Sequence, residues 1–113
     1  MQITHEEVEN GVVIVTVPGP TLDAGSAKGF KSGMAPVLAS ATGLLLDMRE
    51  IQFMDSSGLG AILSCMKQMS AKGWEMKVFG LSRAVRALFE LVRMHKMVEV
   101  YNTREEALAT LGE

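Results

Sequence analysis

The sequence predicts a single α/β domain with one mixed, mostly parallel β-sheet packed by about four α-helices. Apolar runs of strand length alternate with segments of helical periodicity along the whole chain. The run Gly43–Met48 is apolar over its first four residues, as in a central strand buried on both faces. The 113 residues, 48% of them hydrophobic, suit one compact domain over 1–113 with its core in 12–111.

The chain opens with a predicted β-hairpin. The pair Asn10-Gly11 precedes the β-branched run Val12–Val17, and Asn-Gly beside such a run is typical of a tight hairpin turn. Asp23 then provides an N-cap for a first helix that runs to about Ala39. Pro36 lies inside this helix, so we expect a kink there or a separate last turn.

The second half of the chain continues the alternation. A second helix is predicted over about 57–72 and ends at Gly73. The remaining expected elements are a strand with period-two alternation from Trp74, a third helix capped by Ser82, a short strand at 97–101 and a last helix to about Leu111 opened by the capping box Thr103/Glu106.

Composition excludes several classes of function. The net charge is −2 without a block of like charge, whereas nucleic-acid binding needs a basic face. No apolar run reaches the length of a membrane span, and the polar N-terminus does not resemble a secretory signal. The single cysteine, Cys65, cannot form an internal disulfide. We therefore expect a cytoplasmic domain that binds neither nucleic acid nor membrane.

Motifs for catalysis, metals and cofactors are incomplete. His5 and His95 are far apart and have no partner at metal-ligand spacing. The serines lack a Gly-x-Ser-x-Gly elbow, and there is no P-loop. Gly58-Leu59-Gly60 follows a strand and opens a helix, but Leu63 stands where the third glycine of a dinucleotide fingerprint belongs. The sequence predicts no enzyme, no metal and no cofactor.

The stretch Asp55-Ser56-Ser57-Gly58 lies between an expected strand and the second helix. Such residues commonly serve only as a helix cap. A serine there is also suited to phosphorylation, because helix amides and the helix dipole favour an anion and α/β folds place their sites at this end of the sheet. A phosphate would add about −1.5 to −2 charges at pH 7. Both interpretations remain open at this point.

One face of the second helix is expected to bind a partner. It carries small and weakly polar residues with few charges, which is unusual for a helix face exposed only to water. The predicted docking surface joins this face to the loop around Asp23 and to the serine turn. Its residues are Asp23, Asp55, Ser57, Gly58, Gly60, Ala61, Ser64 and Gln68.

The block Phe53-Met54-Asp55-Ser56-Ser57-Gly58-Leu59-Gly60, with the later pattern Ser82…Val85…Leu88-Phe89, resembles the core of a STAS domain. The similarity is greatest to the small bacterial anti-sigma factor antagonists, and it extends from about Val12 to Leu111.

This resemblance implies partner switching. The unphosphorylated antagonist would bind a serine-kinase anti-sigma factor of the histidine-kinase-like ATPase type and release its sigma factor or other effector. Phosphorylation at Ser56, or alternatively at Ser57, would end binding, and a metal-dependent serine phosphatase would restore it. Asp55 would orient the hydroxyl, Ser57 would cap the helix, and Asp23 matches the family's second acidic position. Independently of the resemblance, we expect the free protein to be a monomer.

The chain departs from the family pattern in one loop. Relatives commonly read Gly-Glu-Leu-Asp before the first helix, whereas this chain reads Gly19-Pro20-Thr21-Leu22-Asp23, so partner choice can differ.

Two alternative functions remain open. The chain could be a constitutive STAS subunit of another assembly, such as a lipid-transport or stress-signalling complex, or a STAS domain that binds a small ligand or nucleotide.

Overall fold

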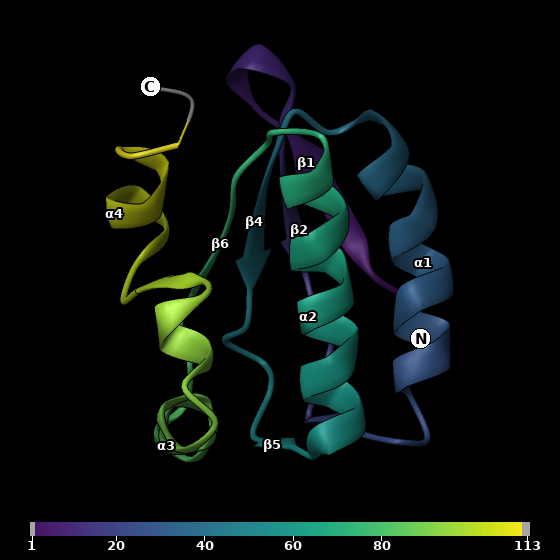
Figure 1. Ribbon diagram of the computed structural model, residues 1–113, viewed down its shortest axis with the longest axis vertical. Coiled ribbons are helices and arrows are strands. Elements are labelled where there is room, and N and C mark those ends of the chain that lie inside the picture. Colours follow the sequence, from purple (N-terminus) through teal and green to yellow (C-terminus); the bar gives the residue numbers. More distant parts are fainter. Residues whose placement is uncertain (1, 112–113) are drawn as a thin grey trace.

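The computed structural model describes residues 2–111 and contains one mixed sheet, a two-stranded ladder and four α-helices (Figure 1). The strands are β1 (Thr4–Glu7), β2 (Val12–Thr16), β3 (Thr21–Leu22), β4 (Gly43–Asp47), β5 (Phe53–Met54), β6 (Met76–Phe79) and β7 (Glu99–Tyr101). The helices are α1 (Ala27–Ser40), α2 (Ser56–Ala71), α3 (Arg83–Leu91) and α4 (Arg104–Leu108), with short 3-10 turns at Glu9–Gly11 and Met94–Lys96.

The main sheet has the strand order β1-β2-β4-β6-β7. Only the β1–β2 pair is antiparallel, and the three remaining pairs are parallel. Strand β4 lies in the centre and all five of its residues are buried, as the apolar run predicted. The expected hairpin is confirmed, since Glu7 pairs with Val13 across a turn in which Asn10 and Gly11 have positive φ.

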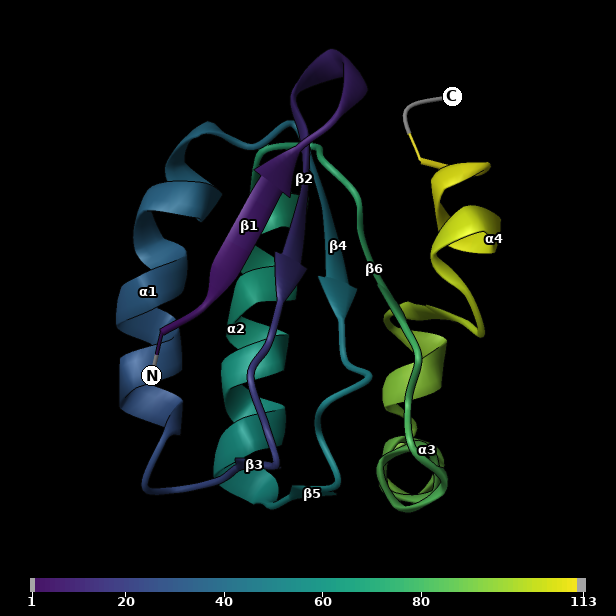
Figure 2. The same cartoon turned by 180° about the vertical axis from the view of Figure 1, so that it is seen from behind.

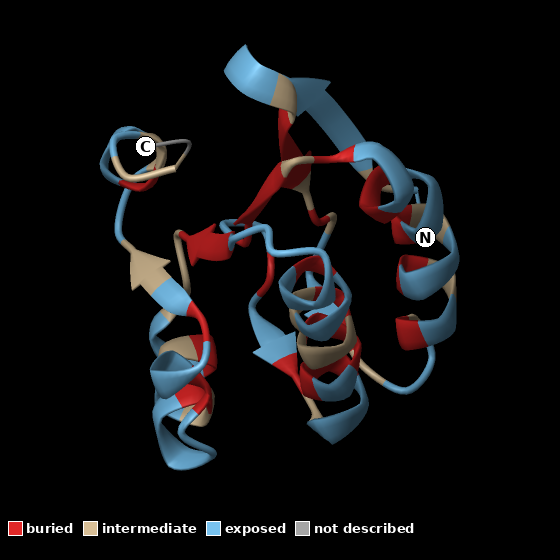
Figure 3. Ribbon diagram, turned by 45° about the horizontal axis from the view of Figure 1, so that its top comes forward, coloured by how far each residue is buried: buried red, intermediate tan, exposed pale blue. Residues whose placement is uncertain are grey.

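The two faces of the sheet are covered unequally. Alternate residues of each strand point to opposite faces. On one face, Val13, Leu44 and Val78 belong to the large core beneath α1 and α2, and the hydrophobic residues of α3 join the same core. The other face, turned toward the viewer in Figure 2, carries a small cluster in which Ala107 of α4 packs with Leu45 and neighbouring residues. The burial colouring of Figure 3 shows the buried positions along the strands and the inner sides of the helices.

Several sequence-based boundaries need correction. Helix α1 begins after Ser26, not at Asp23, and it continues past Pro36 to Ser40 without a break. The capping box of α4 is confirmed, but the helix ends at Leu108 and turn residues follow to Leu111. Hydrophobic periodicity did not indicate the two-residue strands β3 and β5, because two residues are too few for a periodic pattern.

Candidate functional site

The candidate site lies at the end of the sheet where α2 begins (Figure 1). Strands β3 and β5 pair in parallel there, with Thr21 opposite Phe53 and Leu22 opposite Met54. Pro20 strengthens the junction, because its carbonyl accepts the backbone N–H of Gln52 at 2.7 Å. The loop that departs from the family pattern is thus bonded directly to the strand that precedes the serines.

Asp55 is the N-cap of α2. Its Oδ1 accepts the backbone N–H groups of Ser57 at 2.9 Å and of Gly58 at 3.0 Å. Its Oδ2 accepts the backbone N–H of Ala24 at 3.1 Å. The expectation that Ser57 caps the helix is therefore wrong, because Ser57 is already the second residue of α2 and donates its N–H to the Asp55 carboxylate. Asp55 both starts the helix and connects it to the loop before α1.

The environment of Asp55 favours its charged form. The hydrogen bond from the backbone N–H of Gly58 is the largest cause that lowers the pKa of the carboxyl below its usual value, and the N–H groups of Ala24 and Ser57 act in the same direction. Partial desolvation opposes them. The carboxylate is therefore ionised at neutral pH and carries a fixed negative charge beside the serines.

Ser56 and Ser57 are both exposed in the first turn of α2. Within residues 2–111, neither hydroxyl takes part in a hydrogen bond shorter than 3.5 Å. A phosphate on Ser56 would benefit from the helix dipole, but Asp55 already occupies the amides of Ser57 and Gly58. The expectation that helix amides would hold the phosphate therefore needs correction. The hydroxyl side of the first turn of α2 is exposed to solvent.

Gly58 contributes to the site from inside the fold. A Cβ at this position would lie 2.2 Å from the carbonyl oxygen of Leu22 and 2.8 Å from Cγ of Met54. Gly58 is buried, so the expectation that it contacts a partner directly is wrong. Its missing side chain lets the start of α2 approach β3 closely, and this contact holds the serine turn against the Leu22–Asp23 loop.

The outer face of α2 agrees with the predicted docking face only in part. A shallow hollow of about 410 Å³ runs along it and is lined by Gly60, Leu63, Ser64, Lys67, Gln68 and Ala71. Gln68 donates a hydrogen bond to the Ser64 hydroxyl at 3.2 Å. These residues form a surface of small and uncharged groups with one lysine, as expected for an interface that excludes water easily.

Ala61 does not belong to that outer face. It is fully buried, and Cys65, one helical turn further on, is also buried. Both residues belong to the core that α1 and α2 enclose, so the expectation that Ala61 contacts a partner is wrong. Burial raises the pKa of the Cys65 thiol to about 11, and Cys65 acts as a small hydrophobic residue.

Phe53 is a surface residue that the sequence analysis did not single out. Its side chain is 50% exposed, and it lies in β5, three residues before Ser56 and opposite Thr21. An aromatic ring with half of its surface exposed is the kind of group that anchors protein interfaces. Alternation alone could have indicated it, because its neighbour Met54 is buried.

Asp23 lies in the loop that Asp55 binds. Its Oδ1 accepts the backbone N–H of Gly25 at 3.0 Å and the hydroxyl of Ser26 at 3.3 Å. Its own N–H donates to the Ser26 hydroxyl at 3.0 Å. The two acidic residues that the sequence singled out are thus brought to adjacent loops, since Ala24 directly follows Asp23 and bonds Asp55.

The described part of the chain, residues 2–111, contains no group of three His, Cys, Asp or Glu side chains arranged to hold a metal ion. No helix within the same residues is both long and apolar enough to span a bilayer.

Residues 5–107 match the family model described as STAS domain. The chain belongs to the STAS domain family.

Among curated relatives, an anti-sigma F factor antagonist from Paenibacillus polymyxa is 37% identical over 68 residues, which cover 60% of this chain and 58% of the relative. An anti-sigma-B factor antagonist from Listeria monocytogenes is 33% identical over 63 residues, which cover 56% of this chain and 55% of the relative. The matched region thus spans a little over half the length of each relative.

Solved structures share the fold over nearly the whole chain. An anti-sigma factor antagonist from Mycobacterium paratuberculosis superposes with a TM-score of 0.85 at 25% identity, covering 99% of this chain and 96% of that one. SpoIIAA in its phosphorylated form, a Bacillus cell fate determinant, has a TM-score of 0.72 at 22% identity, covering 95% and 96%. A sulfate transporter family protein from Wolinella succinogenes has a TM-score of 0.78 at 20% identity, covering 92% and 87%.

Proposed function

We propose that this chain is an anti-sigma factor antagonist that works by partner switching, with Ser56 as the phosphorylated residue. In its unphosphorylated form it binds a serine-kinase anti-sigma factor of the histidine-kinase-like ATPase type, and the kinase then releases a sigma factor or another effector. Phosphorylation ends the binding, and a metal-dependent phosphatase restores it. The ATP and Mg²⁺ belong to the kinase, so the chain itself performs no catalysis.

The observation that carries the proposal is the exposed hydroxyl of Ser56 beside the fixed carboxylate of Asp55. Both residues lie at the start of a helix whose outer face is small and nearly uncharged. The names of the matched relatives support an antagonist function. The phosphorylated form of SpoIIAA supports the view that this fold accommodates phosphorylation.

Charge explains how modification would end binding. The proposed docking surface consists of Phe53, Ser56, the α2 residues Gly60, Ser64 and Gln68, and the Asp23 loop. The Asp55 carboxylate already places one negative charge at this end of the helix. A phosphate adds about −1.5 to −2 charges beside it, and an interface formed around a neutral hydroxyl would have to desolvate that charge without a matched cation.

The test uses paired baits in a pull-down from a lysate of the host. Wild type and Ser56→Asp serve as baits, with Ser40→Asp as the matched control, because Ser40 is exposed at the far end of α1. We expect wild type and Ser40→Asp to capture a histidine-kinase-like ATPase that Ser56→Asp loses.

Equal capture of the same partner by all three baits would contradict the switch. It would instead mean that this chain is a constitutive STAS subunit of another assembly. Subunits associated with a transporter belong to that class. A Ser57→Ala bait tests the neighbouring hydroxyl. We expect it to retain the kinase and to accept phosphate, since Ser57 contributes only its backbone N–H to the cap.

A further inference from the structure

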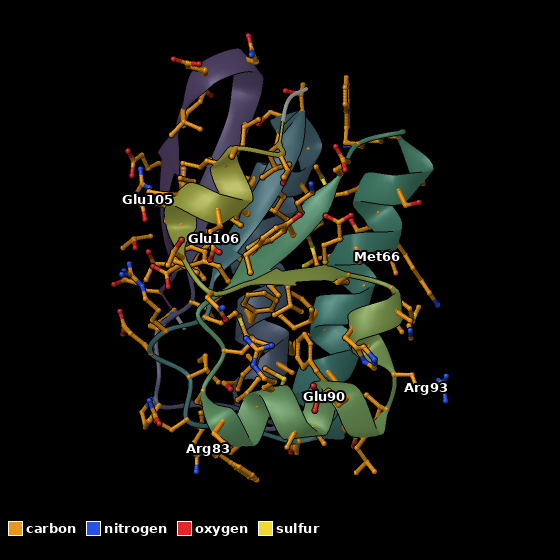
Figure 4. The ribbon with its side chains drawn as sticks, turned by 90° about the vertical axis from the view of Figure 1, so that its left-hand side faces the viewer. Met66, Arg83, Glu90, Arg93, Glu105 and Glu106 are labelled. Atoms are coloured by element: carbon orange, nitrogen blue, oxygen red, sulfur yellow. The ribbon has the colours of Figure 1, made fainter. Side chains whose placement is uncertain are left out.

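A second apolar surface lies on the side of the molecule formed by α3 and the β7 edge. We call it the edge stripe, and its residues are Met66, Trp74, Leu91, Val92 and Met97. Leu91 is 80% exposed, Met97 50%, Val92 47% and Trp74 43%. Figure 4 faces this side and shows Met66 of α2 and Arg93 at the end of α3 near the same border of the molecule. The proposed docking surface uses none of these side chains.

Met97 links the two parts of the stripe along the chain. A hollow of about 180 Å³ is lined by Met66, Trp74 and Met97 together with polar neighbours. Leu91 and Val92 end α3, and a single 3-10 turn, Met94–Lys96, separates them from Met97. Four large side chains that are about half exposed or more along one border exceed the scattered exposed apolar residues of a typical monomer surface.

The two ends of the stripe carry opposite charge. Glu75 and Glu99 line the hollow at one end, and their carboxylates lie 3.6 Å and 3.1 Å from Nζ of the buried Lys77. Two carboxylates share one ammonium there, so one negative charge remains. At the other end, Arg93 and Lys96 follow Leu91.

The positive end is not neutralised by its neighbours. Glu90 precedes Arg93 and Lys96 on the same segment, which leaves a net charge of +1 for these three residues at neutral pH. Within residues 2–111, none of the three side chains forms an ion pair shorter than 4.0 Å. His95, which lies between Arg93 and Lys96, is exposed as well.

We propose that the edge stripe is a self-association surface whose occupant is a second copy of this chain. A two-fold axis through Met97 would set two stripes antiparallel, so that the positive end of each copy meets the negative end of the other. A uniformly acidic peptide or an anionic bilayer fits less well, because Glu75 and Glu99 would face it with like charge.

The dimer should be weak and should leave the switch free. Five side chains form less than the roughly 800 Å² per partner of a standard stable interface, so association should depend on concentration. Ser70 of α2 also lines the hollow. A helix rises about 21 Å from Ser56 to Ser70, so the stripe lies far from the serine turn. Both phosphorylation sites would therefore remain accessible. This inference goes beyond the proposed function. At high concentration, it predicts a dimer in place of the monomer expected from the sequence.

The first test is sedimentation velocity from about 10 µM to about 1 mM, where weak dimers of micromolar affinity become populated. We expect a monomer–dimer equilibrium for wild type that weakens at least about tenfold in the double variant Leu91→Ser/Met97→Ser. Phe53→Ser is the matched control, since it removes an equally exposed apolar side chain from the other surface. It should dimerise like wild type.

The second test is a charge exchange. Lys96→Glu makes both ends of the stripe acidic, and Glu75→Lys makes both ends basic. Each variant alone should self-associate less than wild type, whereas an equimolar mixture should form a mixed dimer. Both positions are exposed, and circular dichroism checks that each variant folds.

Three results would overturn the proposal. The first is a monomer throughout the concentration range. The second is a dimer that neither Leu91→Ser/Met97→Ser nor the charge exchange changes. The third is binding to phosphatidylglycerol vesicles that requires Leu91 and Met97 in a chain that does not self-associate, which would make the stripe a membrane contact.

Discussion

Oδ2 of Asp55 lies 3.1 Å from the backbone nitrogen of Ala24, although the two residues are 31 positions apart in the sequence. The same carboxylate caps α2 through Ser57 and Gly58. One side chain therefore holds together the helix that carries the serines and the loop that carries Asp23. The shape of the proposed docking surface depends on this carboxylate as well as on the exposed groups.

Replacing Asp55 should weaken both the fold and partner binding. Asp55→Ala removes the acceptor of three backbone N–H groups, so the midpoint of urea unfolding should fall. Asp55→Asn keeps one acceptor oxygen and should recover part of the loss. Circular dichroism in urea measures both variants. An unchanged midpoint for Asp55→Ala would contradict the bridging function.

The stability that Asp55 provides should depend on pH. Its pKa is lower in the folded state than the value of about 3.9 expected in the unfolded chain. The folded state therefore binds the proton less readily, and the contribution is fully present above about pH 4. It is lost as the pH falls through the lower folded pKa. The difference in unfolding midpoint between wild type and Asp55→Asn should accordingly be constant from pH 5 to pH 7 and should shrink below about pH 4. A constant difference down to about pH 2 would contradict the lowered pKa of Asp55 in the folded state.

Two glycines of α2 should respond to alanine in opposite ways. Gly58→Ala places a Cβ 2.2 Å from the Leu22 carbonyl oxygen, so it should destabilise the fold by about 1–3 kcal/mol as the helix shifts away from β3. Gly60→Ala meets no atom within 4 Å and should stabilise the helix by about 0.5–1 kcal/mol. Chemical denaturation measures both. Equal effects would mean that the close contact at Gly58 does not constrain the site.

Phe53 should matter for binding more than for stability. Half of its side chain is exposed, so Phe53→Ser should change the unfolding free energy by less than about 1 kcal/mol. Loss of an aromatic anchor typically costs 2 kcal/mol or more in binding, about a thirtyfold weaker Kd. Calorimetry with the captured kinase measures this. Thr21→Ser, on the opposite strand, is the control and should bind normally.

Strong local signals predicted most of the fold. The apolar run of β4, the Asn10-Gly11 turn and the Thr103/Glu106 capping box each determine one element through nearest neighbours, and each was confirmed. The short ladder β3–β5 has no such signal. It forms because Leu22 and Met54 are both buried where the chain enters α2, which depends on contacts distant in sequence.

In the candidate site, too, local sequence signals predicted some features, and contacts distant in sequence determined the others. Periodicity assigned Ala61 to the outer face of α2, since small residues recur there with helical spacing. Ala61 instead belongs to the buried core with Leu59 and Ile62, and this burial depends on contacts with the rest of the fold that periodicity does not show. Asp55 and Ser57 are both good caps by residue type, and only the three-dimensional hydrogen bonds distinguish them.

The partner switch is tested by phosphorylating the chain with its captured kinase, ATP and Mg²⁺ and then measuring its affinity for the same kinase. Peptide mass spectrometry locates the phosphate, and calorimetry compares the modified and unmodified proteins. We expect one phosphate, at Ser56, and a loss of affinity of at least about 100-fold, the effect of several kcal/mol that burying an unmatched charge produces. Phosphate on another residue, or equal affinity before and after modification, would contradict the proposed switch at Ser56.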